Sequence, residues 1–307
     1  MEVGRAATSN RRKHLARGVV VPLLTPLSPD EELDEGGLRR LVRHCISGGA
    51  AMLLALGTTG EAAQLTEAVR DAALRVVLDE NAGAVPVVAG CSDTGTRRTL
   101  RRIEAAARAG ADYALVCPPF YFVADGPGAI PRYYRSLAAG SPLPLVLYNI
   151  PQFCGYALRP ESIAELAKVA GIVGVKDSSG AEGAVDDIVR AVDDDRFAVY
   201  QGWETQSAQG LREGAWGVVP SGANIVPGLY VQLCEAATAG RWDEAERLQS
   251  ALARLSALYD FANVFAVTKA ALRINGICEG AAVTSPHAGA ESVDENALAE
   301  VLDHLRQ

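Results

Sequence analysis

The chain has 307 residues, of which 49% are hydrophobic, so it can bury a large core as one domain or as a barrel with an appendage. Its formal net charge of −8 argues against the basic surface that binds nucleic acid or an anionic membrane. No apolar run has the length of a membrane span, and the N-terminal segment lacks the apolar stretch of a secretion signal. We therefore expect a cytoplasmic protein that acts on small molecules.

Residues 1–17 are basic and show no apolar periodicity, so we expect a flexible basic N-terminal tail. The alternative is a cleaved organelle-targeting peptide, because such peptides are also rich in arginine and serine. Neither interpretation assigns chemistry to this segment.

Short apolar runs with the composition of β-strands recur along the rest of the chain. They are apolar on both faces, as expected for parallel strands that are covered by helices outside and by barrel packing inside. Eight of them are predicted as strands, at 18–24, 51–57, 85–90, 112–118, 143–149, 171–177, 197–202 and 216–222.

Amphipathic segments lie between these runs and are predicted as helices, among them 38–46, 67–81, 96–110 and 160–171. A strand and helix repeated eight times predicts the α/β class and a (β/α)8 TIM barrel. The alternative is an open doubly wound sheet, but the GxGxxG sequence of its first turn is missing after the early strands.

Further helical patterns follow the eighth run, so we expect additional C-terminal helices rather than a second catalytic domain. The predicted organisation is the tail at 1–17, a barrel with the active site at 18–225, and a C-terminal helical extension at 226–307.

Polar residues that end an apolar run are the candidates for chemistry, because barrel enzymes work at the C-terminal ends of their strands. Lys176 ends the sixth run, after Val173 and Val175. Burial there would disfavour the ammonium form and lower the pKa of the lysine, which makes the amine a nucleophile for a carbonyl carbon. The alternative is an ion pair between Lys176 and Asp177.

Two other strand ends carry motifs of interest. The sequence GTTGE at 57–61 offers two hydroxyls and consecutive backbone N–H groups, which can bind a carboxylate or phosphate, although it can also be only a helix cap. The sequence YNIP at 148–151 places Tyr148 on the strand before that of Lys176, so the phenol and the amine can share the barrel mouth. A tyrosine there can transfer protons, and one that only packs its ring is the alternative.

The order and spacing of these motifs, with GVVVPLLTP at 18–26 and GVKDSSG at 174–180, resemble one family. It is the dihydrodipicolinate synthase and N-acetylneuraminate lyase superfamily of Schiff-base-forming class I aldolases. The resemblance covers nearly the whole chain and implies a carbon–carbon or carbon–oxygen lyase of the class I aldolase type.

The resemblance also implies roles for matching residues. Lys176 stands at the Schiff-base lysine and Tyr148 at the proton-transferring tyrosine. Thr58 and Thr59, with the backbone at Gly60, stand at the site that binds the carboxylate of a 2-oxo acid such as pyruvate.

Tyr121 resembles the tyrosine that reaches into a neighbouring subunit and completes a Tyr–Thr–Tyr proton relay with Thr59 and Tyr148. A homodimer, or a homotetramer built as a dimer of dimers, is therefore implied. The backbone around Gly202 and Val219 matches positions that line the floor of the pocket.

The mechanism implied by the family needs no cofactor beyond the covalent lysine imine, and no metal. The four histidines agree with this, since they fall outside all strand-end motifs and show no metal-ligand spacing.

The resemblance does not single out one aldehyde as the second substrate. True 4-hydroxy-tetrahydrodipicolinate synthases carry an arginine for its carboxylate in the turn after YNIP, where this chain has Phe153, and a phenyl ring cannot replace a guanidinium. Sialic acid lyases have an apolar residue in that turn but usually read GSTGE and carry an acidic pair after the seventh strand, where only Glu204 remains. Glu204 and Gln201 can bind substrate hydroxyls, or Glu204 can cap the next helix.

We therefore favour a lyase that joins pyruvate to an aldehyde, or cleaves the product, through the lysine imine. The alternatives are the lysine-biosynthesis synthase itself, which uses aspartate semialdehyde, and an N-acetylneuraminate lyase-like enzyme. A hypothesis of another class is a barrel that binds 2-oxo acids without turnover.

Overall fold

The computed structural model of the protein describes residues 15–122, 126, 128–289 and 292–306. Its strands are all parallel and form a closed barrel in chain order, so the predicted (β/α)8 barrel is confirmed and the open sheet is excluded. The strands are β1 (Gly18–Pro22), β2 (Met52–Ala55), β3 (Val87–Gly90), β4 (Tyr113–Val116), β5 (Leu145–Asn149), β6 (Ile172–Asp177), β7 (Ala198–Gln201) and β8 (Gly217–Val218).

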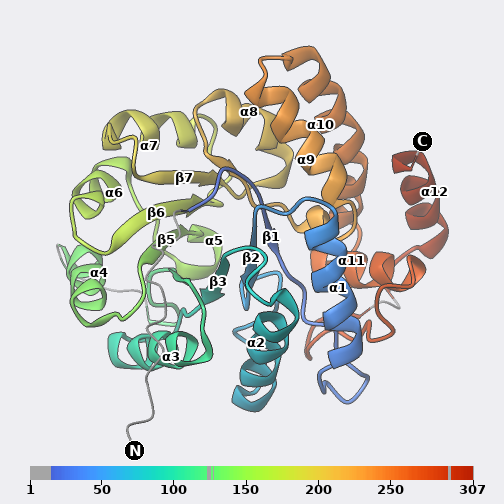
Figure 1. The fold of residues 1–307 in the computed structure, drawn as a ribbon, viewed down its shortest axis with the longest axis horizontal. Coiled ribbons are helices and arrows are strands. Elements are labelled where there is room, and N and C mark those ends of the chain that lie inside the picture. The colour runs from blue at the N-terminus through green and yellow to red at the C-terminus, as the bar shows by residue number, and fades with distance from the viewer. Residues whose placement is uncertain (1–14, 123–125, 127, 290–291, 307) are drawn as a thin grey trace, which may run out of the picture.

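The helices surround the strands, as Figure 1 shows. Those between successive strands include the four predicted ones, and the expected C-terminal helices are also present. The α-helices are α1 (Glu35–Ser47), α2 (Glu67–Asn81), α3 (Thr96–Ala109), α4 (Ala129–Gly140), α5 (Pro151–Cys154), α6 (Pro160–Ala167), α7 (Ala184–Val192), α8 (Ser207–Arg212), α9 (Pro227–Thr238), α10 (Trp242–Ser256), α11 (Val264–Ile274) and α12 (Glu295–Leu305). Short 3-10 turns form η1 (Glu204–Gln206), η2 (Ser221–Asn224) and η3 (Ala257–Asp260).

Successive strand residues pack into two different cores. In β1, Val19 and Val21 join the large cluster between the strands and the helices, whereas Val20 joins a smaller cluster inside the barrel. In β2, Leu53 and Leu54 divide in the same way. Because side chains of a strand alternate between its two faces, a strand that is buried on both faces must be apolar throughout. This is why the strands read as continuous apolar runs.

The helix α2 shows how local sequence sets the helix bounds. The side chain of Thr66 accepts a hydrogen bond from the backbone N–H of Val69 and so caps the first turn. Buried residues recur at helical spacing along it, including Val69, Ala73 and Val77. The helix ends where Ala82 adopts a left-handed conformation (φ 45°).

The last three residues of the predicted tail, 15–17, are part of the barrel and not of a tail. Leu15 is buried in the cluster inside the barrel, and the backbone carbonyl of Ala16 accepts a hydrogen bond of 2.7 Å from the hydroxyl of Tyr200. Residues 15–17 therefore close the bottom of the barrel, since an apolar side chain and a backbone acceptor both find partners there. The rest of the predicted tail, 1–14, lies outside the described residues.

The C-terminal helices contact the barrel to different degrees. Tyr230 and Leu233 of α9 belong to the same core cluster as the outer faces of the strands, whereas Leu298 and Leu302 of α12 pack with α11 in a separate cluster. Figure 1 shows α9 to α12 gathered beside α1. The proposed division of the chain at residue 225 stays a prediction. Among the described residues, no helix combines the length and apolarity that crossing a membrane requires.

We predict that Leu15→Ala destabilises the fold by about 2 kcal/mol or more, because it removes a buried side chain from the barrel interior. Urea denaturation measures the free energy of unfolding of the variant and of the parent protein. The exposed Arg97→Ala in α3 is the control and should change stability by less than about 0.5 kcal/mol. Equal stability of the Leu15 variant and the parent would place Leu15 outside the core.

Candidate active site

The register of two neighbouring strands brings Lys176 and Tyr148 together. Tyr148 of β5 pairs directly with Lys176 of β6, so both side chains point to the same face, into the barrel. Lys176 Nζ lies 3.5 Å from the hydroxyl oxygen of Tyr148 and 4.5 Å from the centroid of its ring. Both residues are buried.

Lys176 has no carboxylate partner among the described residues. The neighbouring Asp177 points to the other face of β6, where it accepts hydrogen bonds from Asn149 and from Ser179. The alternative of a Lys176–Asp177 ion pair is therefore wrong. Since consecutive residues of a strand face opposite sides, the aspartate cannot compensate the buried ammonium.

Burial lowers the pKa of Lys176 from 10.5 to about 7. The cavity beneath it has a volume of about 20 Å³ and is lined mainly by apolar residues, including Leu54, Val146 and Val219. Such surroundings disfavour the ammonium ion, so a large share of the amine is uncharged at neutral pH. The site therefore provides the nucleophilic form of lysine without a neighbouring base.

The Tyr148 hydroxyl links the amine to the loop after β2. It lies 3.2 Å from the hydroxyl of Thr58, at hydrogen-bonding distance. Burial raises the pKa of Tyr148, and the contact with Thr58 opposes the rise. The phenol thus remains protonated and can donate to, or accept from, a group that reacts with Lys176.

The threonine of the predicted relay is corrected by this geometry. The Thr59 hydroxyl lies 3.0 Å from that of Ser221, which follows β8, while Thr58 contacts Tyr148 of β5. Consecutive residues of the turn point to different strand ends, so only Thr58 faces the tyrosine. Ser221 was missed in the sequence, although a serine that ends the eighth apolar run was a usable signal.

The turn at 57–60 also presents backbone donors. Within the described chain, the N–H groups of Thr58, Thr59 and Gly60 donate to no protein acceptor. The carbonyl of Gly60 accepts a hydrogen bond of 2.9 Å from Thr25, which braces the turn against the end of β1. A Cβ at position 60 would lie 2.9 Å from the carbonyl oxygen of Leu23, so this close approach requires glycine. Consecutive free N–H groups in a turn form a site for an anion.

Gly202 and Val219 both lie close to Lys176. A Cβ on Gly202 would lie 2.8 Å from Lys176 Cε, so the glycine leaves room for the lysine side chain. Val219 is buried and lines the same small cavity as Lys176. Both residues therefore shape the surroundings of the amine.

Tyr121 and Phe153 lie away from the amine. Tyr121 is 84% exposed, has a left-handed backbone (φ 76°), and makes a ring contact with Phe122 rather than with Tyr148. Phe153 lies on α5 and is 63% exposed. In the single chain, neither is brought into contact with Lys176.

Glu204, which the sequence offers as a substrate-binding residue or as a helix cap, contacts η2, α9 and α10. Its buried carboxylate accepts hydrogen bonds from the hydroxyl of Tyr230 (2.5 Å), from the N–H of Gly222 (3.1 Å) and from the hydroxyl of Ser256 (3.2 Å). Burial raises the pKa of Glu204, and these bonds oppose the rise. The residue braces η1 against α9 and α10.

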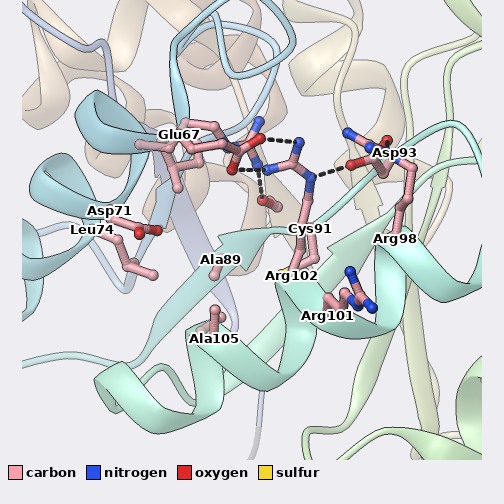
Figure 2. Close-up of a pocket in the computed structure, with 14 residues that line it drawn as sticks. Glu67, Asp71, Leu74, Ala89, Cys91, Asp93, Arg98, Arg101, Arg102 and Ala105 are labelled. Carbon is pink, nitrogen blue, oxygen red and sulfur yellow. Dashed lines mark hydrogen bonds and ion pairs between the residues drawn. The ribbon is translucent and has the colours of Figure 1, made fainter.

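A larger pocket, of about 410 Å³, lies outside the barrel between α2 and α3. Figure 2 shows Arg102 between Glu67 and Asp93, with which it forms ion pairs. Neither Lys176 nor Tyr148 lines this pocket. Among the described residues, no group of three or more His, Cys, Asp or Glu side chains is arranged to hold a metal ion.

Comparison with known proteins identifies the family of this chain. The family described as "Dihydrodipicolinate synthetase family" matches residues 15–305. A 4-hydroxy-tetrahydrodipicolinate synthase of Stenotrophomonas maltophilia is 37% identical over 247 residues, which are 80% of this chain and 82% of that protein.

Solved structures are also similar. A prophage protein of the dihydrodipicolinic acid synthase family from E. coli K12, in complex with pyruvate, has a TM-score of 0.87 and 28% identity, over 95% of this chain and 98% of its own. A chloride-inhibited dihydrodipicolinate synthase of Acinetobacter baumannii, complexed with pyruvate, has a TM-score of 0.88 and 27% identity, over 95% and 99%. The chain belongs to the dihydrodipicolinate synthetase family and is a lyase of the class I aldolase type.

Proposed function

We propose that this lyase forms an imine between Lys176 and pyruvate and uses it to make or cleave the carbon–carbon bond to an aldehyde. The observation that carries the proposal is the buried amine held 3.5 Å from a phenol at the carboxyl end of the barrel. The pyruvate complexes of the two solved relatives support the choice of 2-oxo acid.

The first steps follow from the chemistry of the residues. The amine of Lys176 adds to the keto carbon, and the carbinolamine loses its hydroxyl as water after Tyr148 supplies a proton. The carboxylate binds at the free N–H groups of Thr58, Thr59 and Gly60, which fixes the keto carbon near the amine. Thr58 passes protons to and from Tyr148 through their contact.

The iminium then acts as an electron sink. The phenolate of Tyr148, left by the loss of water, takes a proton from the adjoining carbon and an enamine forms. The enamine attacks the aldehyde carbon and forms the new bond, and Tyr148 gives the proton to the aldehyde oxygen. In the reverse direction, the bond breaks, its electrons return to the iminium, and the aldehyde leaves. Hydrolysis releases the 2-oxo acid and restores Lys176. No further cofactor is proposed, since the imine supplies the electron sink.

We propose that the active form is a cytoplasmic homodimer or homotetramer. Tyr121 and Phe122 are 84% and 77% exposed and pack edge to face, and two adjacent exposed aromatic rings fit an interface between subunits. The exposed position of Tyr121 in one chain is consistent with a role in the site of a partner, where it would extend the relay through Thr58.

For the aldehyde, we propose an apolar or hydroxylated partner without a carboxylate near Phe153. The alternatives remain the condensation of pyruvate with aspartate semialdehyde, which the name of the Stenotrophomonas relative favours, and N-acetylneuraminate cleavage. Because Glu204 is fully engaged in bracing helices, it gives no support to sugar binding.

The imine is tested by trapping. Incubation with pyruvate and borohydride should add one reduced pyruvyl group to Lys176, detected by mass spectrometry of peptides. Lys176→Ala should give no adduct, whereas Lys168→Ala, on the surface after α6, should react like the parent. A folded parent protein without adduct would support the barrel that only binds.

Imine formation should depend on pH through the lysine. At limiting pyruvate, its rate should rise about tenfold per pH unit below the pKa of about 7 and level off above it, since only the free amine reacts. Timed mixing with pyruvate, followed by a borohydride quench, measures this rate between about pH 5.5 and 9. A rate that keeps rising toward pH 10 would indicate an ordinary, solvated lysine.

The aldehyde is tested with a panel of 4-hydroxy-2-oxo acids, sialic acid, and pyruvate with aspartate semialdehyde. We expect kcat/KM to be highest for 4-hydroxy-2-oxo acids without a second carboxylate. Phe153→Arg should shift the ratio toward aspartate semialdehyde by about tenfold, and Phe153→Leu, the uncharged control, should not. Turnover of aspartate semialdehyde alone by the parent protein would contradict our interpretation of Phe153.

A further inference from the structure

A fully buried ion pair lies directly behind the turn that presents the free N–H groups. Glu61, the residue after Gly60, places Oε1 2.6 Å from Nζ of Lys269 in α11, and both side chains are 0% exposed. The pair joins the loop after β2 to a helix added after the barrel. None of the mechanistic steps above uses either residue.

The second carboxylate oxygen is held as firmly. Glu61 Oε2 accepts hydrogen bonds from the backbone N–H of Thr284 (2.7 Å) and from its hydroxyl (2.8 Å). Lys269 in turn donates to the backbone carbonyl of Ala282 at 2.6 Å. The carboxylate and the ammonium are therefore fixed by α11 and by the segment that follows it.

Stability alone does not account for this arrangement. Burial lowers the pKa of Lys269, and the charge and hydrogen bond of Glu61 oppose this most strongly, with smaller contributions from Cys278 and Glu31. Removing two charges from water is costly, and replacing a buried pair by apolar residues is often neutral or stabilising. A buried pair is better suited to fixing one geometry, because any displacement would leave a charge without its partner.

The geometry that it fixes is that of the turn. Glu61 has a left-handed backbone (φ 55°), which a residue with a side chain adopts only when its surroundings hold it there. Its N–H donates to the carbonyl of Thr58 at 2.9 Å and closes the turn. The carboxylate thus anchors the residue that closes the turn, and this turn carries the free N–H groups of Thr58, Thr59 and Gly60.

We propose that Glu61, Lys269 and Thr284 are positioning residues that hold the turn in the form that binds the substrate carboxylate. The inference rests on the proposed function, since it assigns these residues to the 2-oxo acid site. It also gives the part of the chain after the barrel a role in substrate binding, because α11 supplies Lys269 and the segment after α11 supplies Thr284.

The test measures imine formation with pyruvate by the double variant Glu61→Gln/Lys269→Met, which removes both charges together. Because the turn binds substrate but does not react, we expect the half-saturating pyruvate concentration to rise by about tenfold or more. The limiting rate should change by less than about threefold. Thermal unfolding checks that the variant remains folded.

A matched control is Asp93→Asn/Arg102→Met, which removes the ion pair between the end of β3 and α3 and the ion pair of Arg102 with Glu67 of α2, while Glu61, Lys269 and Thr284 stay unchanged. Its half-saturating concentration should equal that of the parent. Thr284→Val removes only a hydroxyl contact to Glu61 and should raise the half-saturating pyruvate concentration by about threefold. If the double variant does not fold, this single variant tests the positioning role.

The positioning role would be overturned if the folded double variant kept the half-saturating pyruvate concentration of the parent protein. The same result with Thr284→Val would overturn it if the double variant did not fold. An equal rise in the control would overturn it as well. The parent protein is tested before the variants. If it formed no adduct with pyruvate, that result would contradict the proposed function itself and not the positioning role.

Discussion

The chemistry that we propose for this protein depends on one amine enclosed by the barrel without a described carboxylate partner. Lys176 lies inside a closed ring of strands, where burial lowers its pKa to about 7 and no described carboxylate restores the charge. The barrel makes this possible because alternate residues of each strand face a dry interior. Asp177, one residue further, faces the other side and takes its hydrogen bonds there.

Around the amine, each strand end supplies one part of the site. The register of β5 with β6 sets the phenol of Tyr148 beside the amine, and Gly202 after β7 leaves the space that the lysine side chain occupies. The loop after β2 brings Thr58 to the phenol, and its N–H groups at 58–60 have no acceptor among the described residues. A site built from several strands is rigid, because moving one part would break the closed sheet.

Two buried carboxylates show how the barrel and the helices added after it are joined. Glu204 connects η1 to α9 and α10, and Glu61 connects the loop after β2 to α11 and the segment after it. Around each carboxylate, several protein donors replace the hydrogen bonds to water that the group loses on burial. The C-terminal helices are thus attached to strand ends through polar contacts as well as through apolar packing.

The sequence by itself determined the strand and helix order, the barrel, and the place of Lys176 and Tyr148 on adjacent strands, because these depend on local periodicity and on consecutive strands pairing. It did not determine which threonine faces Tyr148, the direction of Glu204, the partner of Glu61, or the burial of Leu15. Those contacts join residues far apart in the chain, and neighbours in a turn point to different strand ends. Only the closed barrel, with its helices packed around it, decides which of them meet.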